Sequence, residues 1–448
     1  YHITSTLIHA LGALAAFLVL RRLSNCDVPA LLAAVLFLIC EDHGMTVAWI
    51  ATITDLMCAL FLNLAFWSHI TARENHQPWR FGLSILLFLA ALGSKETAAI
   101  YPIMIAVYEF LFAEKLSFGD MQDQGKRVTC RERIKLFVRH WWSWGIPLAI
   151  FAAYLIFYRS LFPPVGGLMY IDPFTQPLQY AFRALPNLPV MFVALLTQYL
   201  PSLVMMMPGS LPFVAGIGVI LMILLIAALL PYRNERVIWF SLLIFILSLL
   251  PGLATDPGER LLYFPSVYGL FVAAWLIFQL PHVRSRLSSP NNSQPSSPVT
   301  PPTLTRVWGW YLLITAFILP LILLFIYPFM WIPGLKLPED TVLNSLSHIE
   351  TDTHQHIVYL NTNSSYNTFY LPDIYRYHRG DYVDLRVLSS FNGRISARSK
   401  GVHTIILRTE DIGWLSNMFA RLVRTEPEFT VGELYTTDLF TATILEIT

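Results

Sequence analysis

The chain has 448 residues, of which 55% are hydrophobic and only 13% are charged, and its formal net charge is +1. This composition excludes a soluble globular protein, and no cluster of basic and aromatic residues indicates nucleic-acid binding. Apolar runs near the roughly 20 residues needed to cross a bilayer recur along the sequence. We therefore predict an α-helical polytopic membrane protein.

About ten apolar segments are expected to be membrane spans. They are residues 2–20, 28–40, 46–69, 81–94, 97–113, 141–162, 212–230, 237–255, 263–280 and 307–330. Lys and Arg concentrate in alternate loops between these spans, most densely in 114–140. By the positive-inside rule those loops are cytoplasmic. The chain is then expected to begin and end on the outer side.

This topology is consistent only if the segment 178–207 does not cross the membrane completely. It is apolar enough to insert, but it lies in a stretch that is rich in proline. These prolines are Pro163, Pro164, Pro173, Pro177, Pro186, Pro189 and Pro201. Proline removes a helical hydrogen-bond donor and kinks the backbone. We therefore expect short helices in the outer interface at this place rather than a further span.

The C-terminal part of the sequence changes character. Residues 282–306 are rich in Ser, Pro and Asn and predict a disordered cytoplasmic linker before the last span. Residues 331–448 predict a small extracytoplasmic α/β domain. Its expected strands are His356–Leu360, Val383–Leu388 and His403–Leu407, its expected helix is Ile412–Val423, and Asn363 begins a glycosylation sequon.

The rare polar residues of the spans fall mostly toward the predicted outer face. They are His2, Ser5 and His9 on one helical stripe, the Glu41-Asp42-His43 run, Asp55, the Lys95-Glu96 pair, Asp172, Asp256, Glu259 and Arg260. Asp55 lies about nine residues into the third predicted span, which places it roughly 14 Å deep. Ionisable residues at such depth usually line a functional cavity. We expect a polar cavity that opens to the outside.

Each of these residues also has a simpler interpretation. The two histidines of the first span can hydrogen-bond neighbouring helices, and the acids between spans can be solvated. Asp55 can be held by a structural partner. Lys95 and Arg260 suit a lipid-linked phosphate at the bilayer edge, although a single interfacial cation is more often a snorkelling anchor.

Four stretches carry a resemblance to a known group. They are Tyr1-His2-Ile3-Thr4-Ser5 through His9, His43 through Ile50 with Asp55-Leu56, Ser94-Lys95-Glu96 with Pro102, and Glu259 through Ser266. In this order they resemble the GT-C superfamily of glycosyltransferases that use polyprenyl-phosphate sugars. Within it, the transmembrane protein O-mannosyltransferases and their bacterial relatives are the most similar. The resemblance covers roughly residues 1–281.

The sequence also departs from the pattern of that family. Cys40-Glu41 stands where the family has His-Pro, Ile53 stands where it has Arg, and no tetratricopeptide repeat follows. The resemblance implies a general base upstream of residue 1, on a loop after a first span that would precede this chain. Asp42 and Glu41 are the alternatives within the sequence.

The resemblance implies an inverting transfer of a sugar, with mannose favoured, to a hydroxyl of a protein or glycan. Donor-phosphate binding would fall to Lys95, Arg260 and Tyr263, and substrate binding to His2, His9, His43, Asp55 and Glu96. No metal or cofactor is expected. A bacterial enzyme would lie in the plasma membrane, and a eukaryotic one in the endoplasmic reticulum. The alternatives are a transporter or flippase and a non-catalytic scaffold for the outer domain.

Overall fold

The structure is a computed structural model of the chain. It describes residues 1–112, 130–161, 170–198, 201, 204, 208–280 and 301–322, and, further on, 356–359, 384–387, 395–401, 403–409, 431–432, 434–436, 441–443 and 445. The chain divides into two compact units. Unit 1 comprises Tyr1–Val165 and Ile171–Leu323, and unit 2 comprises Gly166–Tyr170 and Leu324–Thr448.

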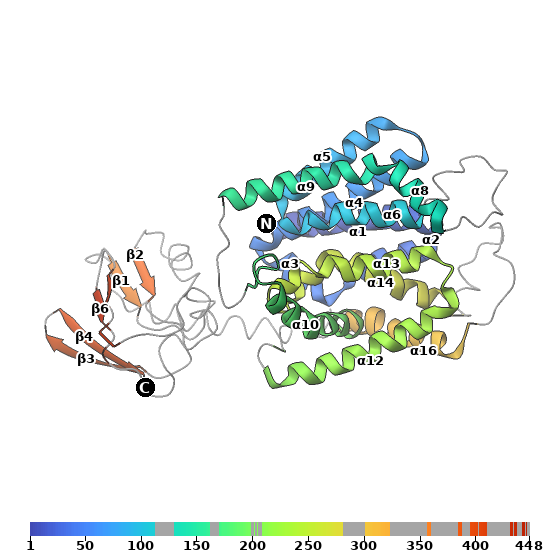
Figure 1. The fold of residues 1–448 in the computed structure, drawn as a ribbon. Helices are drawn as coiled ribbons and strands as arrows, with labels where there is room; N and C mark the ends of the chain where they lie inside the picture. The colour runs from blue at the N-terminus through green and yellow to red at the C-terminus, as the bar shows by residue number, and fades with distance from the viewer. Residues whose placement is uncertain are drawn as a thin grey trace. The chain divides into compact units, whose positions relative to one another are not determined.

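Unit 1 is a bundle of mostly apolar helices, and most of them run roughly parallel to one another (Figure 1). They are α1 (His2–Ser24), α2 (Asp27–Ile39), α3 (Gly44–Ala48), α4 (Ile53–Glu74), α5 (Pro78–Ser94), α6 (Tyr101–Leu111), α8 (Cys130–Arg139), α9 (Trp141–Leu161), α10 (Pro177–Thr197), α12 (Leu211–Leu229), α13 (Arg236–Leu249), α14 (Tyr263–Phe278) and α16 (Thr303–Leu312), which a π-helical turn (Leu313–Ile318) continues. Within the described residues, eight helices are long and apolar enough to cross a membrane, or nine if the bent pair α2 and α3 forms one span. This confirms a helical architecture with several candidate spans.

Helix α14 forms the centre of the bundle. Of its apolar stretch 83% is buried, the highest share among the described candidate spans, whereas only 6% of α9 is buried. It packs against α2, α13 and α16. Small residues permit this close approach, because a Cβ on Gly309 of α16 would lie 2.8 Å from the Leu276 carbonyl oxygen. Tight packing of this kind stabilises helix pairs in lipid, where no hydrophobic effect drives them together.

The predicted span 46–69 is wrong in its first part. The chain forms the short helix α3, leaves the helical conformation at Trp49 (ψ 126°), and begins α4 only at Ile53. The Thr52 hydroxyl holds this break by donating to the Thr46 carbonyl oxygen at 2.7 Å. Asp55 therefore lies in the first turn of α4 and not nine residues into a span.

The prediction of short helices in 178–207 is also wrong. Helix α10 is continuous from Pro177 to Thr197 despite the internal Pro186 and Pro189. Its two ends nevertheless contact the same end of the bundle. Near its start, the Tyr180 hydroxyl donates to the Leu250 carbonyl oxygen at 2.7 Å, and just after its end Gln198 accepts the Glu41 N–H at 2.9 Å. Length and composition would allow α10 to cross a membrane.

The other predicted spans overlap described helices. The fifth comprises a 3-10 turn, η3 (Glu96–Ile100), followed by α6. The last begins at Thr303 and is described as far as residue 322. Most of the predicted linker, residues 281–300, lies outside the described residues.

The described part of unit 2 contains three two-stranded sheets. Strand β1 (His356–Tyr359) pairs in parallel with β2 (Asp384–Val387), while β3 (Ile395–Gly401) with β4 (Thr404–Thr409) and β5 (Leu434–Thr436) with β6 (Thr441–Thr443) pair antiparallel. The three predicted strands coincide with β1, β2 and β4. The predicted helix 412–423 and the sequon at Asn363 lie outside the described residues.

The contact between α10 and α12 gives a test of the fold. A Cβ on Gly218 would lie 2.4 Å from the Pro189 carbonyl oxygen, so Gly218→Ala must push α10 and α12 apart. We expect this change to lower the free energy of unfolding by about 1–3 kcal/mol. Gly216→Ala is the matched control, because nothing lies within 4 Å of a Cβ there. Thermal unfolding in detergent compares the two variants, and equal melting temperatures would contradict the packing.

Candidate functional site

Four segments that are distant in sequence meet at one end of the bundle. They are η1 (Glu41–His43), the first turn of α4, η3 together with the preceding Lys95, and the turn η7 (Glu259–Leu262) that leads into α14. Among them η1 contacts η7, and α4 contacts η3. We call this the Asp55 end of the bundle. It contains most of the residues that the sequence predicts for the site.

The centre of this end is an ion pair between Asp55 and Lys95. The Lys95 ammonium donates to Asp55 Oδ1, and the two side chains are only 17% and 11% exposed, respectively. The Arg260 side chain is exposed and lies close enough for its positive charge to interact with the Asp55 carboxylate. Glu96, also exposed, interacts with the same carboxylate. The structure thus brings Asp55, Lys95, Glu96 and Arg260 together, as the sequence predicts.

Beside the ion pair, two histidines and a tyrosine form a buried hydrogen-bonded cluster. His43 Nδ1 lies 2.9 Å from the Phe37 carbonyl oxygen, which can only accept, so this nitrogen donates. His43 Nε2 lies 2.8 Å from the Ser266 hydroxyl, and that hydroxyl donates to the Tyr263 carbonyl oxygen at 2.9 Å. His9 Nδ1 lies 2.8 Å from the Tyr263 hydroxyl. Phe37 packs against the rings of all three. His9, His43 and Tyr263 are therefore partnered within the protein, adjacent to the ion pair.

A group of carboxylates lies at the same end. Asp42 is fully buried, and among the described residues its Oδ1 has no hydrogen-bond partner. The charges of Glu259 and Glu41 act on it. The Glu41 backbone is fixed by Gln198, whose amide also donates to the Leu195 carbonyl oxygen at 3.1 Å. A buried, unsatisfied oxygen calls for an explanation, and accepting a hydrogen bond from a ligand would supply one.

Two other predicted residues have contacts of their own. His2 is exposed at the start of α1 and has a ring contact with Tyr1. Asp172 accepts two hydrogen bonds of 2.8 Å from Arg159 and one of 2.9 Å from the Phe174 N–H. Burial alone would raise the pKa of Asp172, but these hydrogen bonds outweigh it and hold the pKa below its usual value. Asp172 therefore has a structural partner.

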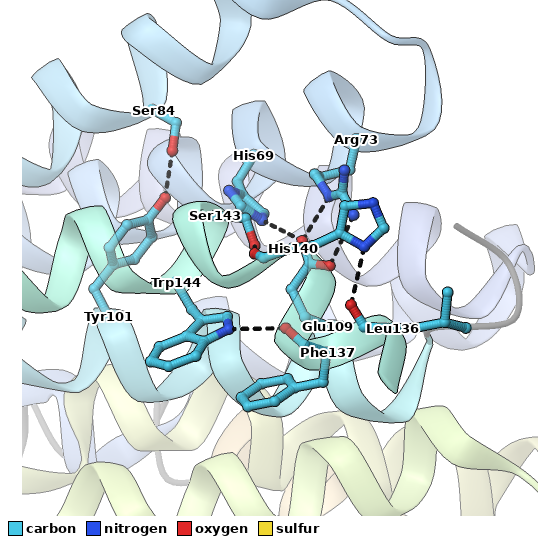
Figure 2. Close-up of polar contacts among 10 residues, drawn as sticks. All are labelled: His69, Arg73, Ser84, Tyr101, Glu109, Leu136, Phe137, His140, Ser143 and Trp144. Carbon is cyan, nitrogen blue, oxygen red and sulfur yellow. Dashed lines mark hydrogen bonds and ion pairs between the residues drawn. The ribbon is translucent and has the colours of Figure 1, made fainter. Parts of the chain in front are cut away.

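The opposite end of the bundle has an ionic cluster that the sequence does not predict (Figure 2). Glu109 of α6, only 2% exposed, accepts hydrogen bonds from Arg73 at 2.6 and 3.0 Å, and its Oε1 lies 3.3 Å from His69 Nε2. The Arg73 guanidinium also lies 5.4 Å from the Trp142 ring centroid. The sequence does contain one indication of this cluster: Glu109 is a single acid in an apolar segment, and such an acid needs a partner. We call this the Glu109 end.

Among the described residues, no group of three or more His, Cys, Asp or Glu side chains could hold a metal ion.

No known family model matches the chain, and no curated protein or solved structure gives a significant match.

The Glu109 cluster predicts a large effect on stability. Glu109→Ala leaves Arg73 without its partner in a buried site, and we expect a loss of about 3–5 kcal/mol in the free energy of unfolding. Asp27→Ala is the control, because it removes an exposed ion pair with Arg21 and should cost at most about 1 kcal/mol. Unfolding in mixed micelles measures both. Similar losses in the two variants would contradict the structural role of Glu109.

Proposed function

We propose that the chain is a membrane glycosyltransferase that moves a sugar from a polyprenyl-phosphate donor to a hydroxyl acceptor with inversion, and that the sugar is mannose. The observation that carries this proposal is the meeting of Asp55, Lys95 and Arg260 at one end of an apolar bundle. Two cations beside lipid-facing helices suit a lipid-borne phosphate. In this proposal the Asp55 end faces the extracytoplasmic side.

The two cations have different parts in donor binding. Asp55 holds the Lys95 ammonium in place, so Lys95 is preorganised. Arg260 is exposed, and no described residue forms a hydrogen bond or ion pair with it, so its guanidinium is available to a phosphate as a bidentate donor. As the bond from the anomeric carbon to the phosphate oxygen breaks, its electron pair leaves with the phosphate. Fixed cations stabilise that developing charge.

The acceptor hydroxyl must lose its proton as it attacks the anomeric carbon. Within the described residues Asp42 is the best-supported base, because its Oδ1 has no other hydrogen-bond partner. Inversion requires the base and the leaving phosphate on opposite faces of the sugar ring. A base upstream of residue 1 remains the alternative that the family resemblance implies.

The scaffold alternative has one observation in its favour. His9, His43 and Tyr263 are hydrogen-bonded to protein groups, as in a purely structural core. A scaffold would bind no donor and would show no transfer. An assay of sugar transfer therefore distinguishes a scaffold from a glycosyltransferase.

Arg260 provides the main test of the proposal. Protein reconstituted with radiolabelled polyprenyl-phosphate mannose and candidate hydroxyl acceptors should show transfer. Arg260→Ala should lower kcat/KM by about 10²–10³-fold, the usual cost of removing a group that stabilises a transition-state anion. Arg260→Lys should retain part of the wild-type kcat/KM. The matched control is Arg233→Ala, which removes an exposed arginine in the turn between α12 and α13. Equal activity of the two alanine variants would refute the role of Arg260.

A second test concerns the base. Asp42→Asn should abolish transfer while leaving binding of the donor intact, because the amide cannot accept the proton. Glu41→Gln should retain activity, since the structure holds Glu41 through its backbone. Transfer by Asp42→Asn at the wild-type rate would exclude Asp42 and direct the search upstream. Melting temperatures of both variants show whether any loss reflects unfolding.

A further inference from the structure

Helix α8 is too short to cross a membrane and exposes an unusual combination of side chains. Its 10 residues span about 15 Å. On its exposed side lie Arg131, Lys135 and Arg139, together with Ile134 and Val138, which are 51% and 59% exposed. Trp141, two residues after the helix, is also 59% exposed. Large apolar groups and cations thus share one surface.

The two kinds of side chain form adjacent stripes along the helix. At roughly 100° per residue, Arg131, Lys135 and Arg139 lie within an arc of about 80°. Ile134 and Val138 lie beside this arc, on the side opposite to Glu132. A helix with an apolar stripe next to a cationic one is typical of segments that lie in the plane of a membrane interface.

The other side of α8 is fixed to the protein at the Glu109 end. The Phe137 ring stacks on Trp144 with centroids 4.9 Å apart and contacts Phe110 at 6.2 Å. The Trp144 indole N–H donates to the Phe137 carbonyl oxygen at 3.3 Å, as Figure 2 shows. Arg133 also reaches the Leu111 carbonyl oxygen. The stripes therefore keep a fixed position where the apolar helix α6 ends.

We propose that α8 is an interfacial helix that binds anionic phospholipids, with Arg131, Lys135 and Arg139 on the headgroup phosphates and Ile134, Val138 and Trp141 at the acyl boundary. A zwitterionic lipid surface has no net negative charge to neutralise these three cations. A soluble acidic partner would not cover the adjacent apolar stripe. Because these groups lie at the other end of the bundle from Asp55, the inference holds whether or not the chain is a glycosyltransferase. It places the Glu109 end at the anionic leaflet.

Amide hydrogen exchange of the whole chain in nanodiscs tests this proposal. Peptides covering 131–139 are followed in phosphatidylcholine alone and in phosphatidylcholine with phosphatidylglycerol. We expect exchange about tenfold slower with the anionic lipid, and the difference should vanish at high salt. The triple variant Arg131→Gln, Lys135→Gln, Arg139→Gln should lose the difference. Glu132→Gln, on the same helix, should keep it.

Three outcomes would overturn the proposal. Exchange that is equal in the two lipid mixtures would show that the cations do not select anionic lipid. If the triple variant kept the full difference in exchange between the two lipid mixtures, another part of the chain would be responsible for it. Slowing by inorganic phosphate in phosphatidylcholine nanodiscs would indicate a phosphate site instead of a membrane surface. Exchange in α14, the buried centre of the bundle, reports whether a variant has lost its fold.

Discussion

An ionised side chain in an apolar bundle is stable only if an opposite charge or several hydrogen-bond donors reach it. Removing such a charge from water costs several kcal/mol, and a well-placed partner recovers this cost. Four acids among the described residues of unit 1 follow this constraint by pairing with an arginine or lysine from another segment. These pairs are Asp55 with Lys95, Glu109 with Arg73, Asp172 with Arg159, and Asp256 with Arg183. Each pair fixes one contact of the bundle.

The two ends of the bundle satisfy this constraint to different degrees. At the Glu109 end, a single carboxylate receives donors from both Arg73 and His69. At the Asp55 end, a buried carboxylate oxygen of Asp42 has no described donor, and Arg260 is exposed. Proteins tolerate unsatisfied polar groups mainly at functional sites. Unsatisfied buried atoms occur at both ends, because His69 Nδ1 of the Glu109 cluster also has no described partner. The exposed Arg260 is what distinguishes the Asp55 end as a place suited to a polar ligand.

The sequence predicts the helical segments well because hydropathy and length are local properties. It fails where tertiary contacts decide the backbone. The break at Trp49 depends on hydrogen bonds of Thr52, and α10 stays continuous through its prolines while Gly218 lets α12 approach. Neither of these contacts can be predicted from a hydropathy profile.

The polar residues show the same division between local and tertiary information. Rare charges in apolar segments correctly predict that Asp55, Lys95 and Arg260 come together. The role of each residue depends on burial and on partners, which only the fold provides. His43 illustrates this, because its ring lies between Phe37 and Ser266 and both nitrogens have partners. The partner of Glu109 was missed for the same reason: Arg73 belongs to a predicted loop but lies within α4.

Helix α10 connects the two halves of the proposed site. Near its start, Arg183 pairs with Asp256, four residues before Arg260, and just after its end Gln198 holds the backbone of Glu41, next to Asp42. Gln198 adopts a left-handed conformation (φ 55°) to do so, which is uncommon for a residue with a side chain. A rigid helix bound at both ends fixes the separation of the segments that it joins. An inverting displacement needs such a fixed separation, because base and phosphate must face opposite sides of one sugar ring at the same time. In the proposed mechanism, the continuity of α10 through its prolines therefore matters for the chemistry as well as for the fold.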